Sequence, residues 1–443
     1  MTLRPLLPLA EREALLNELG ENPPLEPATG REPVHVVYGG GHLFRATTAG
    51  KLGKLAVQMV ATYAPDESSF AEAMGLPEGA GLRERVLRKL ELEPVEDYRI
   101  DFEDGYGLRS DGEEDEHASA AAKEVARGLR EGSLPTWMGL RCKALSSDTQ
   151  GRALRTLDRF FSSLHGEGEA PPEGFVVTLP KVSSTAQVAV LVGALERIER
   201  AAGWSVGRIR VELMIETPAA LVSPEGRLAP RRLVEAARGR CSSVHFGTYD
   251  YTAACGITAE HQRPDHMACL LARGLLQVSL AGTGVRISDG ATTVLPTVLH
   301  PVNNELTEGQ REENRKAIHR AWRVHVRNVT RALEEGIYQG WDLHPGQLPA
   351  RYAALYAFFL AGAPESGRRL RHFMARAAQA TQVGGVFDDA ATGQGLLNYF
   401  RRALSCGALT AEEVRIYSGL DPTALQVRSF GELAGREGVP FGG

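Results

Sequence analysis

The feature that most constrains the fold is an alternation of eight short β-like runs with longer helical patterns. Amphipathic helical stretches such as 185–201 and 264–281 separate consecutive runs. Strands that alternate with helices favour parallel pairing, and eight such units are the number that closes a (β/α)8 barrel. The runs lie at 33–38, 97–102, 137–143, 175–182, 208–216, 242–247, 284–290 and 340–345.

Residues within these runs alternate between apolar and polar side chains. In the run 208–216 the odd positions are aliphatic and most even positions are charged, so the two kinds lie on opposite faces. In the last run the same alternation sets Trp341 and Leu343 against Asp342 and His344. A two-sided parallel sheet would be apolar on both faces. We therefore expect a barrel with an apolar outer face, a polar interior and its chemistry at the carboxyl ends of the strands.

The composition excludes several other classes of protein. The 443 residues carry a formal net charge of −5 without a basic tract, which argues against a nucleic-acid partner. No run of about 18 apolar residues occurs and the first residues soon become charged, so we expect neither a membrane span nor a signal peptide. Five scattered cysteines without CxxC spacing predict a reduced, cytoplasmic protein that holds no structural zinc.

An acidic stretch ends the second run. The sequence DYRIDFEDGYG, residues 97–107, places Asp101, Glu103 and Asp104 where a strand stops. Carboxylates that meet there repel each other and lose solvation unless a cation or a donor-rich ligand compensates them. The stretch therefore indicates a ligand or metal site, with a solvated loop as the alternative interpretation.

Several motifs together resemble one known family. The segments ELMIETPAAL (212–221) and VHFGTYDYTAACGI (244–257), with DFEDGYG, LPKV and GWDLHPGQ, are similar to the HpcH/HpaI aldolase and citrate lyase β-subunit family. The resemblance covers roughly residues 33–360, with the motifs in family order on successive predicted strands. It implies a TIM barrel of the phosphoenolpyruvate/pyruvate type.

The resemblance implies that Glu216 and Asp250 are ligands of Mg²⁺, with Mn²⁺ as an alternative metal. The two acids are 34 residues apart, wider than the family spacing, and the extra length falls within 223–241. Two hard oxygen ligands leave positions on Mg²⁺ for water and for a bidentate 2-oxo acid. In the alternative interpretation both acids only cap neighbouring helices.

Arg141 matches the third-strand arginine of the family, which implies that it binds the substrate carboxylate and helps to stabilise an enolate. Its planar guanidinium suits bidentate recognition of a carboxylate in a way that Lys143 does not. Arg141 is alternatively a counter-ion of Glu212 inside the barrel, and the two roles are compatible.

The resemblance also implies supporting roles around the metal. Glu103 and Asp104 would bind metal-bound water and orient the arginine. Asp101 lies deeper on the interior face and is expected to pair with Arg99 or Lys181. Lys181 is expected to form a salt bridge within the protein or with the substrate.

The first strand departs from the family pattern. The residues YGGGH (38–42) stand where coenzyme A lyases carry a proline–glycine turn with a nearby basic residue. They fit neither GxxxxGK[ST] nor GxGxxG, so we interpret them as a tight turn rather than a nucleotide site. His42 is a loop histidine in this interpretation, with a catalytic base as the alternative. The departure weakens the case for a coenzyme A thioester substrate.

The chain divides into three predicted parts: an N-terminal helical extension (1–32), the catalytic barrel (33–362) and a C-terminal helical lid and oligomerisation segment (363–443). In the lyases and malate synthases that this barrel resembles, a C-terminal segment covers a barrel mouth and can supply an aspartate base, sometimes to a neighbouring subunit. Asp388 or Asp389 is the candidate base here, with a helix N-cap as the alternative. An apolar stripe on this arm predicts a homo-oligomer, either a trimer or a hexamer.

We therefore expect a Mg²⁺-dependent carbon–carbon lyase or aldolase that cleaves or forms a small 2-oxo or 2-hydroxy carboxylate through an enolate. Its expected partners are small oxo or hydroxy acids. One alternative is an enzyme of the malate synthase or malyl-CoA lyase type that uses an acyl-CoA. Another is a non-catalytic barrel subunit, against which the joint presence of Arg141, Glu216 and Asp250 argues.

Overall fold

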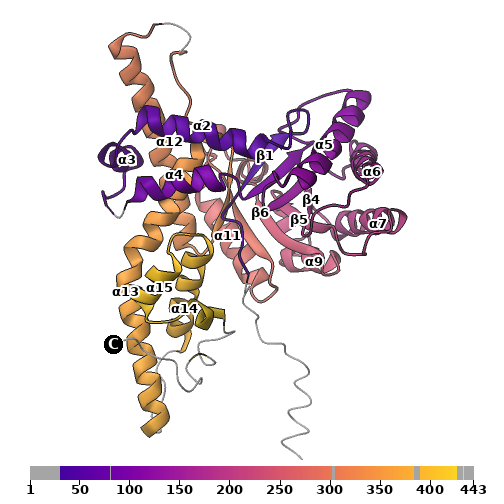
Figure 1. The fold of residues 1–443 in the computed structure, drawn as a ribbon. Coiled ribbons are helices and arrows are strands. Elements are labelled where there is room, and N and C mark those ends of the chain that lie inside the picture. Colours follow the sequence, from indigo (N-terminus) through magenta and orange to yellow (C-terminus); the bar gives the residue numbers. More distant parts are fainter. Residues whose placement is uncertain (1–29, 80, 302–304, 384–389, 427–432, 434–443) are drawn as a thin grey trace, which may run out of the picture.

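Eight parallel strands close into a barrel in the computed structural model of the chain (Figure 1). The strands pair in sequence order, and β8 pairs with β1 to complete the circle. This topology confirms the predicted (β/α)8 barrel. The structure describes every residue except 1–29, 80, 302–304, 384–389, 427–432 and 434–443. The strands are β1 (His35–Gly40), β2 (Asp97–Asp101), β3 (Trp137–Arg141), β4 (Val176–Leu179), β5 (Arg210–Ile215), β6 (Cys241–Phe246), β7 (Arg286–Ala291) and β8 (Gln339–Asp342).

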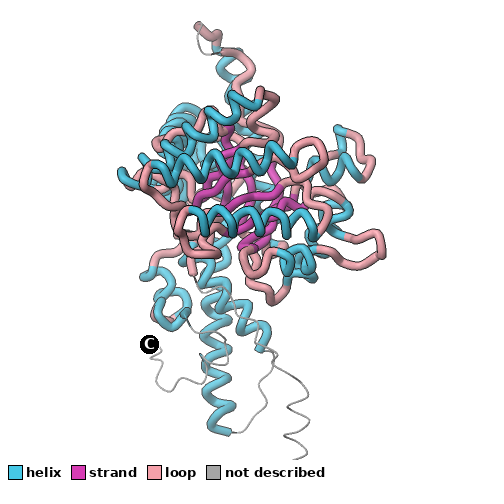
Figure 2. The backbone as a smooth tube through the Cα atoms, turned by 90° about the vertical axis from the view of Figure 1, so that its right-hand side faces the viewer, coloured by secondary structure: helices cyan, strands magenta, loops and turns pink. Residues whose placement is uncertain are grey.

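Helices surround the strands (Figure 2). Three long helices begin with a capping box, in which a Ser or Thr side chain accepts the backbone N–H three residues later: Ser110, Ser184 and Thr307 precede α5, α7 and α12. The helices are α2 (Thr48–Tyr63), α3 (Glu67–Met74), α4 (Leu82–Leu92), α5 (Asp111–Glu131), α6 (Gln150–Gly166), α7 (Thr185–Ala201), α8 (Pro218–Leu221), α9 (Pro230–Ala236), α10 (Thr248–Ala254), α11 (Met267–Leu280), α12 (Glu308–Glu334), α13 (Leu348–Val383), α14 (Ala390–Ser405) and α15 (Ala411–Ser418).

The interior of the barrel is polar, and its charges are paired. Arg99 of β2 donates from Nη2 to Oε2 of Glu212 on β5 at 2.9 Å, and it also pairs with Asp97. Glu212 further accepts the hydroxyls of Thr178 at 2.7 Å and Ser243 at 2.6 Å. Burial favours the neutral acid, but Arg99 and His245 together outweigh it and hold the pKa of Glu212 well below its usual range. This layer of paired charges is the floor beneath the mouth.

Strand β8 faces the opposite way from the prediction. Trp341 points into the barrel, where its ring centroid lies 4.4 Å from that of Tyr38. Asp342 points outward and is fully buried against α13, where Arg351 donates to it at 2.8 Å. His35 of β1 contacts the same carboxylate at 2.8 Å. The prediction assumed that the polar side chains of a strand face the barrel interior, which holds only where the outer face is apolar. It was wrong for β8 because Asp342 belongs to a buried ion network between the sheet and the helices.

The C-terminal helices pack beside the amino-terminal end of the barrel and extend past it (Figures 1 and 2). The hydroxyl of Tyr352 on α13 donates to the carbonyl of Pro94, just before β2, at 3.2 Å. Arg402 of α14 pairs with Glu32, just before β1, and lies 4.7 Å over the ring of Tyr338, just before β8. The helices described in this segment are therefore not a lid over the mouth of their own barrel.

The predicted domain boundaries have no clear break in the structure. Helix α13 runs without interruption across residue 362, where the sequence analysis ends the barrel. The residues before 30 lie outside the description, so the division into three parts stays a prediction.

All five cysteines are free, and four of them are buried. Within the described ranges, no helix is long and apolar enough to cross a membrane.

Candidate active site

The carboxyl ends of β2 and β3 hold a buried ion pair at the mouth of the barrel. Arg141, the last residue of β3, is the register partner of Asp101, the last residue of β2. Its Nε lies 2.7 Å from Oδ1 and its Nη2 2.5 Å from Oδ2 of Asp101, so the contact is bidentate. Asp101 also accepts the backbone N–H groups of Glu103 at 2.9 Å and Gly105 at 2.8 Å. One carboxylate thus fixes both the arginine and the acidic turn after β2.

These contacts correct two expectations. From the sequence, Asp101 is expected to pair with Arg99 or Lys181, and Glu212 is an alternative partner of Arg141. Both pairings are wrong, because Asp101 faces Arg141 across adjacent strands and Glu212 is already occupied in the floor. Several acids and arginines alternate on the same interior face, so the sequence alone does not select among the pairs.

The acidic turn is tied across the mouth to Lys181, which follows β4. The ammonium group of Lys181 pairs with Glu103 and lies 3.1 Å from Oδ1 of Asp104. Oε2 of Glu103 lies 3.1 Å from Nη1 of Arg141. Burial raises the pKa of Glu103, against the lowering effect of Arg141 and Lys181. Glu103, Asp104, Lys181 and Arg141 are therefore brought together, as the sequence analysis expects.

The backbone of Lys181 carries a further signal that the sequence did not show. Its φ angle is +49°, a left-handed conformation that a residue with a side chain adopts only at a cost of about 1–3 kcal/mol. In this conformation its N–H donates to Oε1 of Glu216 at 2.6 Å. The same residue thus holds the acidic turn with its side chain and a predicted metal ligand with its backbone.

Glu216 and Asp250 lie near each other at the ends of β5 and β6. Glu216 follows β5 directly and is 3% exposed, whereas Asp250 lies in the first turn of α10 and is exposed. Burial, together with the negative charge of Asp250, raises the pKa of Glu216 to about 8. Lys181 donates the one hydrogen bond to the Glu216 side chain that the described residues provide.

The local chain is shaped to present Glu216. Thr217, not Glu216, caps α8, because its hydroxyl accepts the N–H of Ala220 at 3.2 Å. A Cβ added at Gly247 would lie 2.5 Å from both Cβ and Oε2 of Glu216, so the turn into α10 needs glycine there. The alternative in which Glu216 is only a helix cap does not hold.

The donor set at the mouth fits a hard divalent cation. A buried carboxylate beside a second acid is destabilised by desolvation and repulsion, and a cation relieves both. No group of three or more His, Cys, Asp or Glu in the described part of the chain is arranged to hold a metal ion. The protein would supply two carboxylates and leave the other positions to water and substrate, which is common for Mg²⁺.

Arg141 keeps one edge of its guanidinium toward the mouth. Asp101 occupies the Nε/Nη2 edge, while Nη1 contacts Glu103 and, at 3.6 Å, the sulfur of Met214. The guanidinium also lies 4.9 Å over the ring of Tyr38 and 5.4 Å over that of Trp341. Glu103 is thus the carboxylate that a ligand would have to displace first to reach the Nη1/Nη2 edge.

Trp341 and Tyr38 are site residues that the sequence reasoning missed. The indole Nε1 of Trp341 is buried and has no hydrogen-bond partner among the described residues. An aromatic donor of this kind usually finds a partner when it is buried. The GWDLHPGQ motif contains Trp341, but the sequence reasoning placed this side chain on the outer face of the strand and so did not assign it to the site. His344 of the same motif caps the short helix that begins at Pro345.

The glycines after β1 are required by packing. A Cβ added at Gly39 would lie 1.9 Å from the Tyr98 hydroxyl, and one at Gly41 would lie 2.6 Å from the ring of Phe102. Nearby, His42 lies 5.5 Å from the ring of Tyr106. Burial, aided by nearby positive charge, lowers the pKa of His42, so the imidazole is neutral at pH 7.

Asp388 and Asp389, the predicted catalytic bases, lie outside the described residues. The helix that follows them, α14, contacts the amino-terminal end of the barrel through Arg402. Their predicted role is therefore not tested here.

Comparison with protein families identifies one family that matches most of the chain. A family model described as "Domain of unknown function (DUF6986)" matches residues 18–433 of the 443. The chain belongs to this family. A search of curated proteins finds no match.

Solved structures resemble this DUF6986 protein at low similarity. The malate synthase of Haloferax volcanii, in a lead(II) complex, is 13% identical with a TM-score of 0.46, over 86% of this chain and 90% of that chain. The citrate lyase beta subunit of M. tuberculosis, complexed with oxaloacetate and magnesium, is 16% identical with a TM-score of 0.38, over 74% and 97%.

Proposed function

We propose that this DUF6986 protein is a Mg²⁺-dependent carbon–carbon lyase that acts on a small 2-oxo or 2-hydroxy carboxylate. The observation that carries the proposal is the meeting of two groups at one barrel mouth. Glu216 and Asp250 form a carboxylate pair suited to a hard cation, and Arg141 presents a guanidinium edge beside it. A cation and an arginine fork together match the charges of an oxo acid and its enolate.

Glu216 and Asp250 would hold Mg²⁺, with Mn²⁺ as the alternative. When bound, the ion supplies Lewis-acid stabilisation of negative charge that develops on a substrate oxygen. The hydrogen bond from the Lys181 N–H fixes one oxygen of Glu216 and leaves the other available as a ligand.

Arg141 would bind the substrate carboxylate at its Nη1/Nη2 edge. Asp101 holds the opposite edge and so fixes the plane of the guanidinium before substrate arrives. Glu103 leaves Nη1 as the substrate carboxylate enters, and the Lys181 ammonium and the backbone N–H of Asp104 retain it at the rim. The unpartnered Trp341 Nε1 offers one further donor to the substrate.

A proton acceptor completes the proposal. Asp388 or Asp389 would serve as the base at the mouth of a neighbouring protomer of a trimer or hexamer, because α14 lies at the amino end of its own barrel. Within one protomer the alternative is His42, which is neutral at pH 7 and lies just after β1.

The decisive test is exchange of the pyruvate methyl protons in deuterated buffer, followed by NMR. We expect exchange with Mg²⁺, and none after EDTA treatment or in the Glu216→Gln variant. A screen of 2-oxo acids with and without aldehydes would then identify the substrate. Exchange that survives both EDTA and Glu216→Gln would exclude the proposed metal site.

The same samples separate the proposed lyase from an acyl-CoA enzyme. A ligand that binds only the native state raises the melting temperature. Protection by coenzyme A would favour the malate synthase or malyl-CoA lyase type. Protection by pyruvate with Mg²⁺ and not by coenzyme A would favour the lyase.

A further inference from the structure

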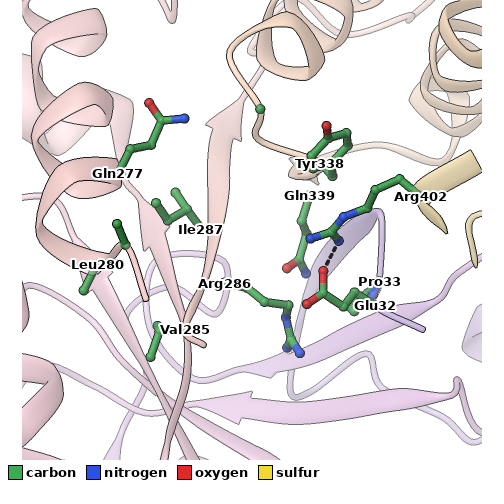
Figure 3. A pocket seen from close by; sticks show the side chains of 12 residues that line it. Glu32, Pro33, Gln277, Leu280, Val285, Arg286, Ile287, Tyr338, Gln339 and Arg402 are labelled. Carbon is green, nitrogen blue, oxygen red and sulfur yellow. Dashed lines mark hydrogen bonds and ion pairs between the residues drawn. The ribbon is translucent and has the colours of Figure 1, made fainter. Parts of the chain in front are cut away.

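A cavity lies at the end of the barrel opposite the mouth, and Figure 3 shows the side chains that line it. It measures about 230 Å³ and is lined by the first residues of two strands, Arg286 of β7 and Gln339 of β8. Since all strands are parallel, these residues are separated from Arg141 and Glu216 by the length of the barrel. A water molecule takes about 30 Å³ of liquid, so the cavity has room for a small organic molecule.

Two polar groups in this cavity lack partners. The Nε of Arg286 is buried without a hydrogen bond, and no carboxylate of the described residues forms an ion pair with this guanidinium. Gln339 is 3% exposed, and its Oε1 is also buried without a partner. Its Nε2 makes only a long contact of 3.4 Å with Asp97. Unpaired buried groups are costly, so they mark a place where a ligand can contribute what the chain does not.

The two sides of the cavity differ in chemistry. Figure 3 shows Gln339, Arg402 and Glu32 on one side and the side chains of Ile287 and Leu280 on the other. Arg402 pairs with Glu32, which is the one carboxylate among the described residues that line the cavity. The half-buried guanidinium of Arg286 therefore has no carboxylate partner among the described residues. A ligand that fits both sides carries a negative charge and an apolar part.

We propose that this cavity binds a small hydroxycarboxylate. Its carboxylate accepts from Arg286, its hydroxyl donates to Oε1 of Gln339, and its carbon chain packs against Ile287 and Leu280. Inorganic phosphate would satisfy Arg286 but leave the apolar wall without contact. Arg402 of α14 lines the same cavity. The bound carboxylate would therefore also lie beside the C-terminal helices, so occupancy would fasten them to the barrel. The inference does not depend on the chemistry at the mouth.

The test uses the full chain in EDTA, so that the mouth holds no metal. The probes are 3-hydroxybutyrate, butyrate, which lacks the hydroxyl, and inorganic phosphate, each at millimolar concentrations. We expect 3-hydroxybutyrate to raise the melting temperature most. Arg286→Met should lower its affinity by roughly tenfold or more, because a charged hydrogen bond is lost. Arg320→Gln, an exposed site on α12, is the matched control and should bind like the wild type.

A second expectation concerns the ligand-free protein. Arg286→Met removes a half-buried charge that forms no ion pair with the described residues, and it keeps nearly the same volume, so its melting temperature without ligand should equal or exceed that of the wild type. Hydrogen exchange in α14 should slow when 3-hydroxybutyrate binds the wild type and stay unchanged in Arg286→Met. Gln339→Met, which removes the acceptor and keeps the guanidinium, should abolish the preference for 3-hydroxybutyrate over butyrate.

Several results would overturn the proposal. They are equal binding by Arg286→Met and wild type, phosphate protection as strong as that by 3-hydroxybutyrate, and no protection of the wild type by any carboxylate probe. A clear fall in the melting temperature of ligand-free Arg286→Met would show that the chain already neutralises this guanidinium. Unchanged exchange in α14 on binding would remove the fastening of the C-terminal helices.

Discussion

At the scale of residues, the mouth is a series of charge pairs in which each member limits its neighbours. Asp101 uses both oxygens on Arg141 and the turn after β2, so it is not free to bind a metal. Lys181 neutralises Glu103 and Asp104, which leaves Glu216 as the buried acid with the least compensation. If the mouth holds Mg²⁺ as proposed, the ion therefore depends on Glu216 more than on the acidic turn after β2.

Asp101→Asn should destabilise the protein much more than the same change at Asp104. Removing the charge of Asp101 leaves Arg141 buried and poorly compensated, which costs about 3–5 kcal/mol. Asp104 is 57% exposed, so Asp104→Asn should cost less than about 1 kcal/mol. Urea unfolding of both variants measures the difference. Equal losses would show that Asp101 does not carry the ion pair.

Glu216→Gln should keep the fold and weaken Mg²⁺ binding by roughly tenfold or more, because an anionic ligand becomes neutral. Calorimetric titration and the gain in melting temperature with Mg²⁺ both report this loss. Glu334→Gln, at an exposed position of α12, is the control and should bind Mg²⁺ like the wild type. Unchanged Mg²⁺ binding in Glu216→Gln would remove this residue from the site.

At the scale of elements, the turns between strands and helices decide where the site residues point. The turn from β6 into α10 is tight because Gly247 passes against Glu216. The turn from α4 into β2 is held at Glu93, which accepts from Lys89 at 2.6 Å and Thr136 at 2.6 Å and also pairs with Arg31. Both turns give the barrel a defined geometry that the flanking elements alone would not fix.

Gly247→Ala should abolish Mg²⁺ binding while the barrel stays folded. The φ angle of Gly247 is −91°, which alanine tolerates, so the effect comes from the contact with Glu216 alone. Gly274→Ala within α11 meets no atom within 4 Å and should be neutral or stabilising by up to about 1 kcal/mol. Circular dichroism checks the fold and titration checks the metal. Retained binding in Gly247→Ala would refute the contact.

Glu93 predicts a pH dependence of stability. Burial opposes ionisation, but Arg31, Lys89 and Thr136 outweigh it and lower the pKa of Glu93 from 4.5 to about 2. The folded pKa is lower than the unfolded one, so the stabilisation is present above pH 4.5 and is lost as the pH falls toward 2. With solvent screening it amounts to on the order of 2 kcal/mol.

Unfolding of Glu93→Gln across this range is the measurement. The variant should be less stable than the wild type at pH 7, and the difference should shrink as the pH falls from 4.5 to 2. Glu91→Gln, an exposed neighbour on α4, should follow the wild type at every pH. A difference between Glu93→Gln and wild type that does not change with pH would contradict the assignment.

At the scale of the whole molecule, the C-terminal helices and the mouth lie at opposite ends of one barrel. Helix α14 contacts Glu32 and Tyr338 at the amino end. A base from this segment would therefore act on another protomer. Light scattering should report a trimer or hexamer at micromolar concentration, and a monomer would rule out a base shared between protomers.

Subunit mixing gives a sharper outcome. Glu216→Gln and the Asp388→Asn/Asp389→Asn double variant should each be inactive as pure oligomers. Hybrids made by mixing them should regain activity, because an intact mouth in one protomer can meet an intact segment of another. Full activity of the double variant alone would return the search for the base to His42.

Part of the candidate site could be predicted from local patterns in the sequence. Strand ends, parity and motifs singled out Arg141, Glu103, Lys181 and Glu216, and the structure brings these side chains together. The sequence assigned Asp101 to the wrong partner because acids and arginines alternate on one interior face. It also missed the left-handed backbone of Lys181, since no residue type in that position signals it.

The sequence by itself determined the barrel. The alternation of strands and helices and the period-2 polarity of the strands are local properties, so they do not depend on how the elements pack. Only the tertiary structure decided which face of β8 points into the barrel. Asp342 points outward because its ion-pair partners, Arg351 and His35, lie outside the sheet. The place of the C-terminal helices was decided in the same way. An amphipathic helix needs an apolar surface to cover, and only the assembled barrel brings α12 and α4, on which α13 packs, side by side.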